Sequence, residues 1–145
     1  MKDAVKHPSH YTAHPSGIEC HEITGLLGGN LSNVVKYVWR YDQKGKPVED
    51  LKKALQYLEF EKKDFLNIGE HTIDKRLQAG IVRLRDLCKT EKEIFKREVF
   101  YGVGAFLVNN ALHSIDNISE KITNKIKELE NENNWKWKNK ICFLG

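Results

Sequence analysis

Residues 7–57 read HPSHYTAHPSGIECHEITGLLGGNLSNVVKYVWRYDQKGKPVEDLKKALQY, and the rest of the chain is organised around this stretch. In its second half, hydrophobic residues recur every three or four positions, which predicts two amphipathic helices. Gly45 and Pro47 separate them, because proline suits the first turn of a helix but not its interior. The expected core residues are Leu31, Val34, Val35, Val38 and Trp39 in the first helix, and Leu51, Ala54, Leu55, Leu58 and Phe65 in the second. The pair should form a sharp hairpin whose tip is basic through Lys44 and Lys46.

The polar sides of the two hairpin helices are expected to face each other. The first helix presents Asn33, Lys36, Tyr37 and Arg40 opposite its hydrophobic side, and the second presents Asp50, Lys53 and Tyr57 at helical spacing. Residues four apart are neighbours on a helix surface, so cations and a phenol ring lie on adjoining turns. Cations bind phosphate oxygens, and an aromatic ring can stack on a base or contact a sugar. This pattern predicts a nucleotide-binding face.

The segment before the hairpin is expected to be irregular up to Gly17, because Pro8 and Pro15 disfavour helix at the residues preceding them. A short helix over residues 18–27 should follow and end at the glycines of positions 28 and 29. Glu19 and Glu22 are one turn apart in that helix, so they could hold Mg²⁺, act as a base, or simply be solvated. The next helix should be capped by Asn30 or Ser32.

Four histidines fall in or near this irregular segment, at positions 7, 10, 14 and 21. They could hold a structural metal, although no cysteine accompanies them in a zinc-like spacing and no metal site is predicted. A loop carried on a scaffold commonly bears recognition groups, so His10 and Tyr11 are interpreted as one edge of a ligand site. The simpler alternative is a loop that Pro8 and Tyr11 pin to the surface.

The second half of the chain is typical of long amphipathic helices. A break is expected at residues 67–70, and Thr72 could cap the helix that follows. The core side of that helix carries Ile73, Leu77, Ile81, Leu84 and Leu87 or Cys88. Residues 90–93 form a capping-box sequence, which should open a further helix. Gly102 and Gly104 could kink the next helix or admit a close neighbour. A hydrophobic series then runs through Val108, Ala111, Leu112, Ile115, Ile118, Ile122, Ile126 and Leu129. It could be a seam for self-association or a helix buried within the chain, and Trp135 and Trp137, interleaved with lysines, could dock on a neighbour.

These patterns predict an all-α protein: an N-terminal loop and helical hairpin core, followed by long C-terminal helices that form a bundle and an oligomer seam. Residues 1–66 would be the nucleotide-binding core and residues 67–145 a helical extension for packing or oligomerisation. The chain has 145 residues, enough for one ordinary core, and a formal charge of +4, which favours anionic ligands without calling for nucleic acid. Three unrelated cysteines, no signal-like segment and no apolar run of membrane-spanning length lead us to expect a cytoplasmic protein with reduced thiols and no membrane partner.

Several of the residues above form an ordered series: PSHY at 8–11, IE at 18–19, N-x-x-K-Y-x-x-R at 33–40, Lys44, and DLxKAxxYL at 50–58. This series resembles the phage-encoded nucleotide kinase-like family, which is largely described as a domain of unknown function and includes a podophage early protein that phosphorylates deoxynucleoside monophosphates. The resemblance covers about residues 7–65. It implies a small oligomeric phage protein of the host bacterial cytoplasm that binds a nucleotide and transfers a phosphoryl group.

The residues that match the motifs of this family are His10, Tyr11, Glu19, Asn33, Lys36, Tyr37, Arg40, Lys44, Asp50, Lys53 and Tyr57. Lys36, Arg40 and Lys44 would clamp phosphate, because phosphoryl transfer needs positioning and charge neutralisation. Asp50 or Glu19 would position a cation or orient the attacking phosphate oxygen, whereas His10, Tyr11 and Tyr37 would hold base or sugar. The simpler interpretation makes Asp50 a helix N-terminal charge and Tyr57 a residue at the edge of the core.

Three functions remain open at this stage. A kinase would use a nucleoside triphosphate donor, with or without Mg²⁺, and would be unorthodox because the chain has no GxxxxGK[ST] phosphate loop. A non-catalytic binder would use the same pocket to sequester a nucleotide or a cyclic-nucleotide signal of host defence. An all-α nucleotide pyrophosphohydrolase would need helix-borne carboxylates around Mg²⁺, for which Glu19, Glu22, Glu49 and Asp50 are the available set.

Overall fold

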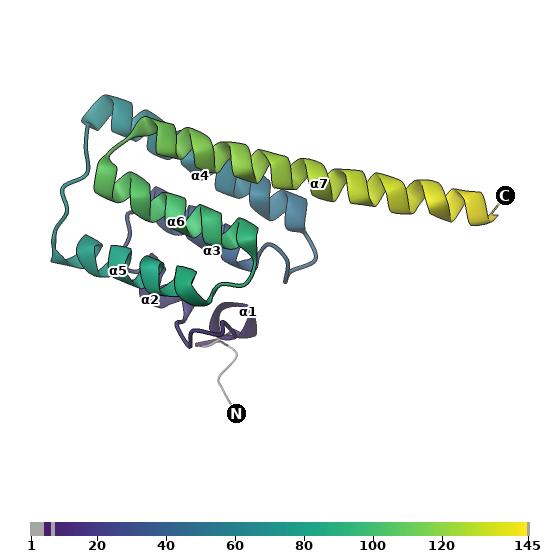
Figure 1. The fold of residues 1–145 in the computed structure, drawn as a ribbon, viewed down its shortest axis with the longest axis horizontal. Helices are drawn as coiled ribbons and strands as arrows, with labels where there is room; N and C mark the ends of the chain where they lie inside the picture. The colour runs from purple at the N-terminus through teal and green to yellow at the C-terminus, as the bar shows by residue number, and fades with distance from the viewer. Residues whose placement is uncertain (1–4, 7, 145) are drawn as a thin grey trace.

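The computed structural model describes residues 5, 6 and 8–144, with backbone alone for 141–144. Within these residues the chain forms seven helices and no strand, which confirms the predicted all-α class (Figure 1). The helices are α1 (Ser9–Thr12), α2 (Cys20–Thr24), α3 (Gly29–Arg40), α4 (Pro47–Ile68), α5 (Lys75–Thr90), α6 (Ile94–Asn109) and α7 (Leu112–Leu144). No helix in the described part of the chain combines the length and apolar composition needed to cross a bilayer.

The predicted hairpin is the pair α3 and α4. The five core positions expected in α3 are all buried, and in α4 Leu51, Ala54 and Leu58 are fully buried while Leu55 and Phe65 pack against the core from its edge. Pro47 stands in the first turn of α4, and Gly45 has φ +73°, a left-handed conformation that glycine adopts without steric cost. Local sequence therefore predicted this hairpin correctly.

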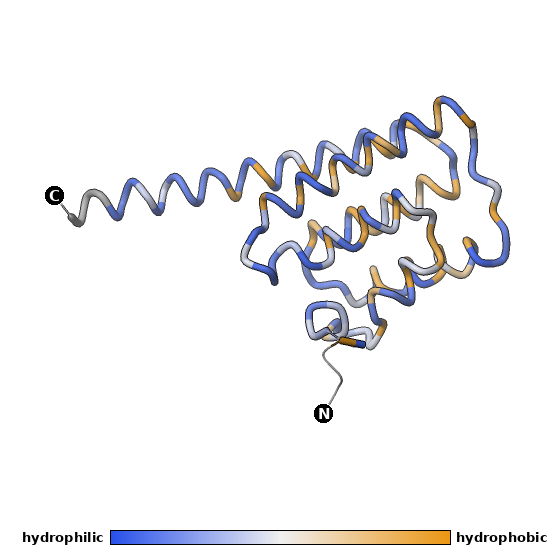
Figure 2. The backbone as a smooth tube through the Cα atoms, turned by 180° about the vertical axis from the view of Figure 1, so that it is seen from behind, coloured by the Kyte–Doolittle hydropathy of each residue, from blue (hydrophilic) through white to orange (hydrophobic). Residues whose placement is uncertain are grey.

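The remaining helices stack on the hairpin in layers (Figure 1). Helix α4 packs against α3 and α7, and α6 packs against α3, α5 and α7, while α2 bridges α3 and α5. Hydrophobic positions turn inward between these layers, as Figure 2 shows along the backbone. The core is continuous, with the Trp39 ring of α3 lying 5.8 Å from that of Phe100 in α6.

Three predicted helix caps are wrong. Gly28 precedes α3 in place of Asn30 or Ser32: Asn30 donates to Glu61 and Asp64 of α4, and Ser32 donates to the carbonyl groups of Thr24 and Leu27. At α5, Asp74 and not Thr72 is the cap, and it accepts the Leu77 amide at 2.8 Å. The predicted capping box at residues 90–93 does not form, because Thr90 ends α5 and α6 begins after Glu93 without a side-chain cap. A cap depends on where the chain enters the bundle, which a short polar sequence does not specify.

The N-terminal segment also differs from expectation, because residues 9–12 form the single helical turn α1. Pro8 lies just before this turn and its carbonyl accepts the Tyr11 amide at 3.0 Å, so the proline starts a turn instead of preventing one. Residues 1–4 and His7, which belonged to the predicted irregular segment, lie outside the described residues.

The predicted C-terminal seam is buried within the chain itself. Ile115, Ile118, Ile122 and Ile126 of α7 are all buried, facing α4 and α6. The series does not run through one helix, because Asn110 adopts a left-handed conformation with φ 49° and separates α6 from α7. Because Gly102 has no side chain, α7 can approach α6 closely at this point: a Cβ on Gly102 would lie 2.7 Å from Cγ1 of Ile118. This part of the seam is therefore not available to a second copy.

Candidate functional site

The polar side of α3 gathers around the ring of Tyr37. Arg40 Cζ lies 4.8 Å from the ring centroid, and the Nζ atoms of Lys36 and of Lys53 from α4 each lie 5.6 Å from it. The ring of Tyr57 stacks on Tyr37 with centroids 6.0 Å apart and planes 17° apart. These five residues, which we call the Tyr37 cluster, bring three cations together, as the helical spacing predicted.

Arg40 connects this cluster to two other helices. Its Nη1 donates to the Tyr11 hydroxyl of α1 at 2.9 Å, and its Nη2 donates to Asp50 Oδ1 of α4 at 3.3 Å. Both side chains of the ion pair are mostly buried, with 15% of Arg40 and 5% of Asp50 exposed. Burial alone would lower the pKa of Arg40, but the hydrogen bonds and charges of Tyr11 and Asp50 raise it overall. Arg40 is thus a charged link between α1, α3 and α4.

The Arg40–Asp50 pair retains unused hydrogen-bonding capacity. Arg40 Nε and Asp50 Oδ2 are buried and have no partner among the described residues. Buried polar atoms are rarely left unsatisfied, so this pair is a place where a ligand or water would be stabilised.

A cleft of about 260 Å³ opens between α1, α2 and α3, and we call it the Lys36 cleft. Its walls include Lys36, Tyr11, Glu19, Cys20 and His21. Burial raises the pKa of the Cys20 thiol to about 12, although the nearby Lys36 and Arg40 act in the opposite direction. The cleft therefore combines two lysines, one carboxylate and one imidazole with apolar and aromatic walls.

Of the three cations of the Tyr37 cluster, Lys36 is the one without a carboxylate partner among the described residues. Within the described part of the chain its Nζ has no hydrogen bond and no ion pair, whereas Arg40 pairs with Asp50 and Lys53 pairs with Glu49 at 3.1 Å. Since Lys36 belongs both to the cleft and to the Tyr37 cluster, an anion bound there would contact the only cation of the three without a carboxylate partner.

His10 and Lys44 lie at the outer edge of this positive region. Partial burial, Lys44 and Arg40 all lower the pKa of His10, which places this imidazole within the field of both cations. Lys44 is exposed in the turn between α3 and α4. An anion bound beside His10 would offset this field.

Two predicted residues do not join the cluster as expected. The Asn33 side chain donates to the carbonyl of Gly29 in its own helix at 2.8 Å. Glu19 and Glu22 form a reciprocal cap at the start of α2: the Glu19 side chain accepts the backbone N–H of Glu22, and the Glu22 side chain accepts that of Glu19. Glu22 also accepts from Arg83 at 3.1 Å, so these carboxylates are not a free pair for Mg²⁺ as the spacing allowed.

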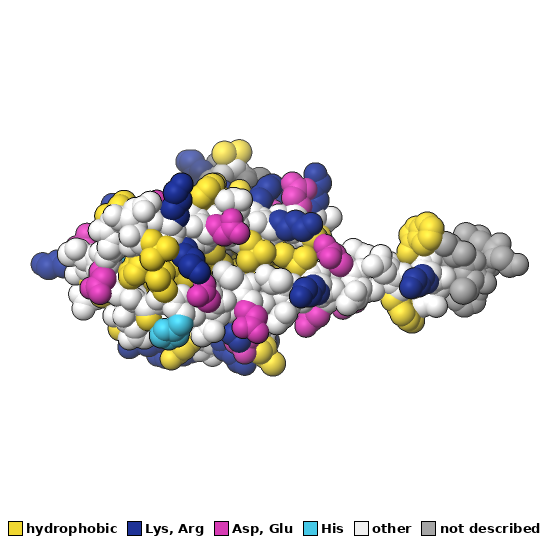
Figure 3. Space-filling view, turned by 90° about the horizontal axis from the view of Figure 1, so that it is seen from above, with side chains coloured by type: hydrophobic (Ala, Val, Ile, Leu, Met, Phe, Trp, Pro, Cys, Tyr) yellow, Lys and Arg dark blue, Asp and Glu magenta, His cyan; other side chains and the backbone are white. Residues whose placement is uncertain are grey.

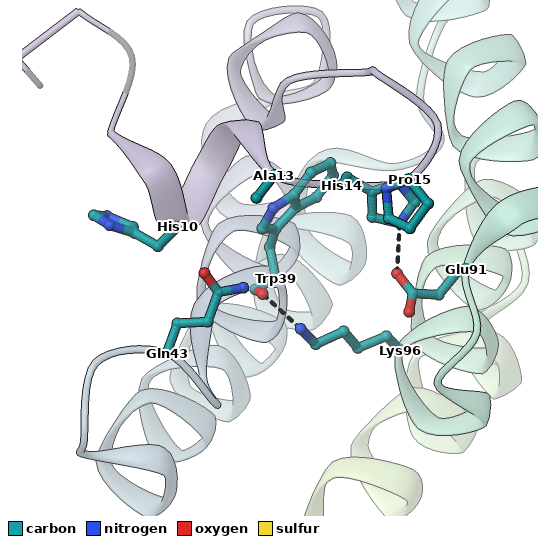
Figure 4. Close-up of a pocket in the computed structure, with 8 residues that line it drawn as sticks. All are labelled: His10, Ala13, His14, Pro15, Trp39, Gln43, Glu91 and Lys96. Atoms are coloured by element: carbon teal, nitrogen blue, oxygen red, sulfur yellow. Dashed lines mark hydrogen bonds and ion pairs between the residues drawn. The ribbon is translucent and has the colours of Figure 1, made fainter. Parts of the chain in front are cut away.

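Sequence reasoning missed a second pocket, of about 140 Å³, on the other side of α1 (Figure 4). His14 Nε2 lies 2.7 Å from Glu91 Oε2, and both side chains are more than nine-tenths buried. Lys96 donates to the Trp39 carbonyl at 2.8 Å and to Asp42 at 2.9 Å. These contacts join residues 57 and 77 positions apart, so no local pattern could have indicated them.

Three polar side chains of this second pocket, His14, Glu91 and Lys96, have hydrogen-bond partners, and Figure 4 shows His10 at its edge, pointing away from Glu91 and Lys96. The pocket therefore fastens the N-terminal segment to the connection between α5 and α6.

Among the described residues, no group of three or more His, Cys, Asp or Glu side chains is placed to hold a metal ion. His7, one of the four histidines of the metal hypothesis, lies outside the described residues. His14 is engaged with Glu91 and Ser16, and His21 lies 3.3 Å from Glu19, so these two do not converge with His10.

Residues 5–59 match the model of a family described as a protein of unknown function, DUF3310. The match spans α1, α2, α3 and the first half of α4, and it contains every residue of the Tyr37 cluster and of the Lys36 cleft named above. No curated protein and no solved structure matches the chain.

Proposed function

We propose that this protein binds a nucleotide with its phosphate on Lys36 and its base or sugar in the Lys36 cleft against Tyr11. The observation that carries the proposal is the position of Lys36, which lies where the cleft meets the Tyr37 cluster and has no carboxylate partner among the described residues. Phosphate is the common dianion whose charge such a cluster would neutralise. Lys53 and Lys44 would add to the attraction from the rim.

Arg40 would stabilise the bound phosphate through its charge and its Nε–H group. Asp50 and Tyr11 hold its guanidinium group in place, so its charge and its free Nε–H are pre-oriented without an entropic cost at the moment of binding. Tyr37 would then serve as the platform that keeps the cations together, because Tyr57 and the cations already cover its ring.

The reaction we propose is transfer of a phosphoryl group from a nucleoside triphosphate to a deoxynucleoside monophosphate in the cytoplasm of an infected bacterium. The support is the resemblance of residues 7–65 to the phage nucleotide kinase-like family, together with the cations described above. Glu19, in the wall of the cleft, is better placed than Asp50 to orient an attacking phosphate oxygen, since Asp50 is buried against Arg40.

A second candidate is binding without turnover, in which the protein sequesters a nucleotide or a cyclic-nucleotide signal. One observation favours it: the two carboxylates paired with cations of the Tyr37 cluster, Asp50 and Glu49, are already neutralised by Arg40 and Lys53, and Glu19 is engaged in the cap of α2. A sequestering protein needs only the cations and the cleft.

The test is incubation of the purified protein with Mg²⁺ and a mixture of linear and cyclic nucleoside mono- and triphosphates, followed by denaturation and chromatography of the small molecules. New nucleoside diphosphates would support the kinase. Unchanged nucleotides, with one species retained by the native protein, would support the binder. The absence of both conversion and retention would refute the nucleotide proposal.

Matched variants locate the site. Lys36→Ala should abolish conversion or retention. Lys63→Ala removes an exposed lysine of α4 that belongs neither to the cleft nor to the Tyr37 cluster, so it should leave both within about twofold of the unaltered protein. Equal effects of the two substitutions would show that general positive charge, and not the Lys36 cleft, attracts the ligand.

A further inference from the structure

The C-terminal end of α7 extends beyond the rest of the molecule (Figure 1). Along α7, the last ion pair with another helix among the described residues joins Lys52 Nζ and Glu130 Oε1, 3.7 Å apart, and residues 131–138 are all exposed. We call residues 131–144 the arm. At 1.5 Å per residue the arm reaches about 20 Å past this ion pair.

The arm has little reason to be helical by itself. Three of its first four residues are asparagine, which has low helix propensity, and a helical segment of this length is marginal in water without a packing partner. It also exposes Trp135 and Trp137, each at 67%. Figure 3 shows hydrophobic side chains on two opposite sides of this end of the molecule. Both features are typical of a segment that docks on another surface.

A receptor surface of matching character lies between α5 and α6. It is a groove of about 230 Å³, largely apolar, formed by Leu84, Phe100, Gly104, Ala105 and the exposed Tyr101 and Val108. A Cβ placed on Gly104 would meet nothing within 4 Å, so the floor of this groove is open. An aromatic side chain would bury about 150–250 Å² on entering such a groove.

Charge distinguishes which part of the arm fits. The exposed Arg85 lines the groove, and a second exposed arginine, Arg97, lies next to Cys88 of the groove wall. Neither arginine has a carboxylate partner among the described residues. Arg97 is close enough to Cys88 in the groove wall to oppose the burial that raises the pKa of that thiol to about 11. In the arm, Glu132 precedes Trp135 by three residues, so the carboxylate and the indole share one side of the helix.

We propose that the arm of a second copy of this chain occupies the α5–α6 groove, with Trp135 in the groove and Glu132 beside Arg85. A chain cannot fill its own groove, because its arm points away from the body that contains α5 and α6 (Figure 1). Reciprocal exchange of two arms closes a two-fold dimer. The predicted C-terminal oligomer contact then lies in the arm and not in the buried isoleucines of α7.

Sedimentation equilibrium of the full chain over a range of concentrations tests the proposal. The unaltered protein should be a dimer, and Trp135→Ala should weaken the dimer by about 30-fold or more, the effect expected of an interface anchor. Trp137→Ala is the matched control: it is equally exposed but lies about 200° around the helix from Trp135, so the dissociation constant should change by less than about threefold.

Two further variants test the groove and the charge pairing. Gly104→Leu fills the open floor of the groove and should give a folded monomer with unchanged helical circular dichroism. Glu132→Arg should weaken the dimer, and adding Arg85→Glu should restore it. A monomeric unaltered protein, equal effects of the two tryptophan variants, or an intact dimer in Gly104→Leu would each overturn the proposal.

An arm that binds nucleic acid through its lysines would give a different result. The chain would then stay monomeric alone and would shift a labelled oligonucleotide, with Trp135→Ala reducing the shift. That outcome would also overturn the proposal. None of these measurements depends on nucleotide turnover, so they are independent of the proposed function.

Discussion

The link between Arg40 and Asp50 is expected to make a large contribution to the stability of the hairpin. Two unit charges 3.3 Å apart attract each other by about 5 kcal/mol at an effective dielectric constant of 20. Removing both groups from water offsets part of this attraction, and the 15% exposure of Arg40 adds solvent screening. We therefore expect a net coupling of about 2 kcal/mol.

A double-mutant cycle of Arg40→Met, Asp50→Ala and the combined variant measures this coupling. Asp50→Ala alone should cost about 3 kcal/mol, because it also leaves the buried guanidinium without its counter-charge. For a chain of this length that loss corresponds to a melting temperature lower by about 9 °C. Circular dichroism at 222 nm during chemical and thermal unfolding gives the four free energies.

The ion pair between Lys62 and Asp116 is the control. Its atoms are closer, at 2.7 Å, but its side chains are 42% and 58% exposed. Solvent screening should therefore reduce its coupling to about 0–1 kcal/mol. A coupling below about 0.5 kcal/mol for Arg40 and Asp50, or a larger one for the exposed pair, would refute the argument that burial decides the strength of these contacts.

Two other predictions concern helix packing and proton linkage. Gly102→Ala should lower the free energy of unfolding by about 1–2 kcal/mol, because its Cβ would lie 2.7 Å from Cγ1 of Ile118. Gly104→Ala should raise this free energy by about 0.5–1 kcal/mol, because its Cβ meets nothing within 4 Å and alanine favours the helix. A thermal melt that ranks the two variants the other way would contradict the close approach of α6 and α7. Burial, Lys44 and Arg40 hold the pKa of His10 below its ordinary value, and a bound phosphate should raise it. Nucleotide affinity should therefore increase as the pH falls through the pKa of His10 and decrease as the pH rises through it. An NMR titration of the His10 ring with and without nucleotide measures the shift, and an unchanged pKa would place the phosphate elsewhere.

Local sequence patterns predicted the parts of the molecule that depend on neighbouring residues. The hydrophobic periodicity of residues 31–58 identifies α3, α4 and their buried sides, since a helix places every third or fourth residue on one face. The same geometry brought Lys36, Tyr37 and Arg40 together, and the breaks at Gly45 and Gly69 follow from backbone conformations that favour glycine.

Patterns of this kind failed where a side chain had more than one available partner. Glu19 and Glu22 have the spacing of a metal-binding pair, but the backbone N–H groups at the start of α2 donate to both carboxylates, which cap the helix instead. Ser32 was a reasonable cap by residue type, yet in the fold its hydroxyl donates to the carbonyl of Thr24 at the end of α2 and to that of Leu27 in the connection that follows.

The sequence by itself determined the helical class, the hairpin and the gathering of cations on one side of α3, because each depends on contacts within one or two helical turns. Only the tertiary structure decided which of those cations keeps its charge available. Arg40 is neutralised by a carboxylate ten residues away across a turn, while Lys36 lines a cleft whose other wall, α1, is followed closely by His14, which contacts Glu91, 77 residues away. The availability of a charge depends on every group that folding brings near it, and those groups come from the whole chain.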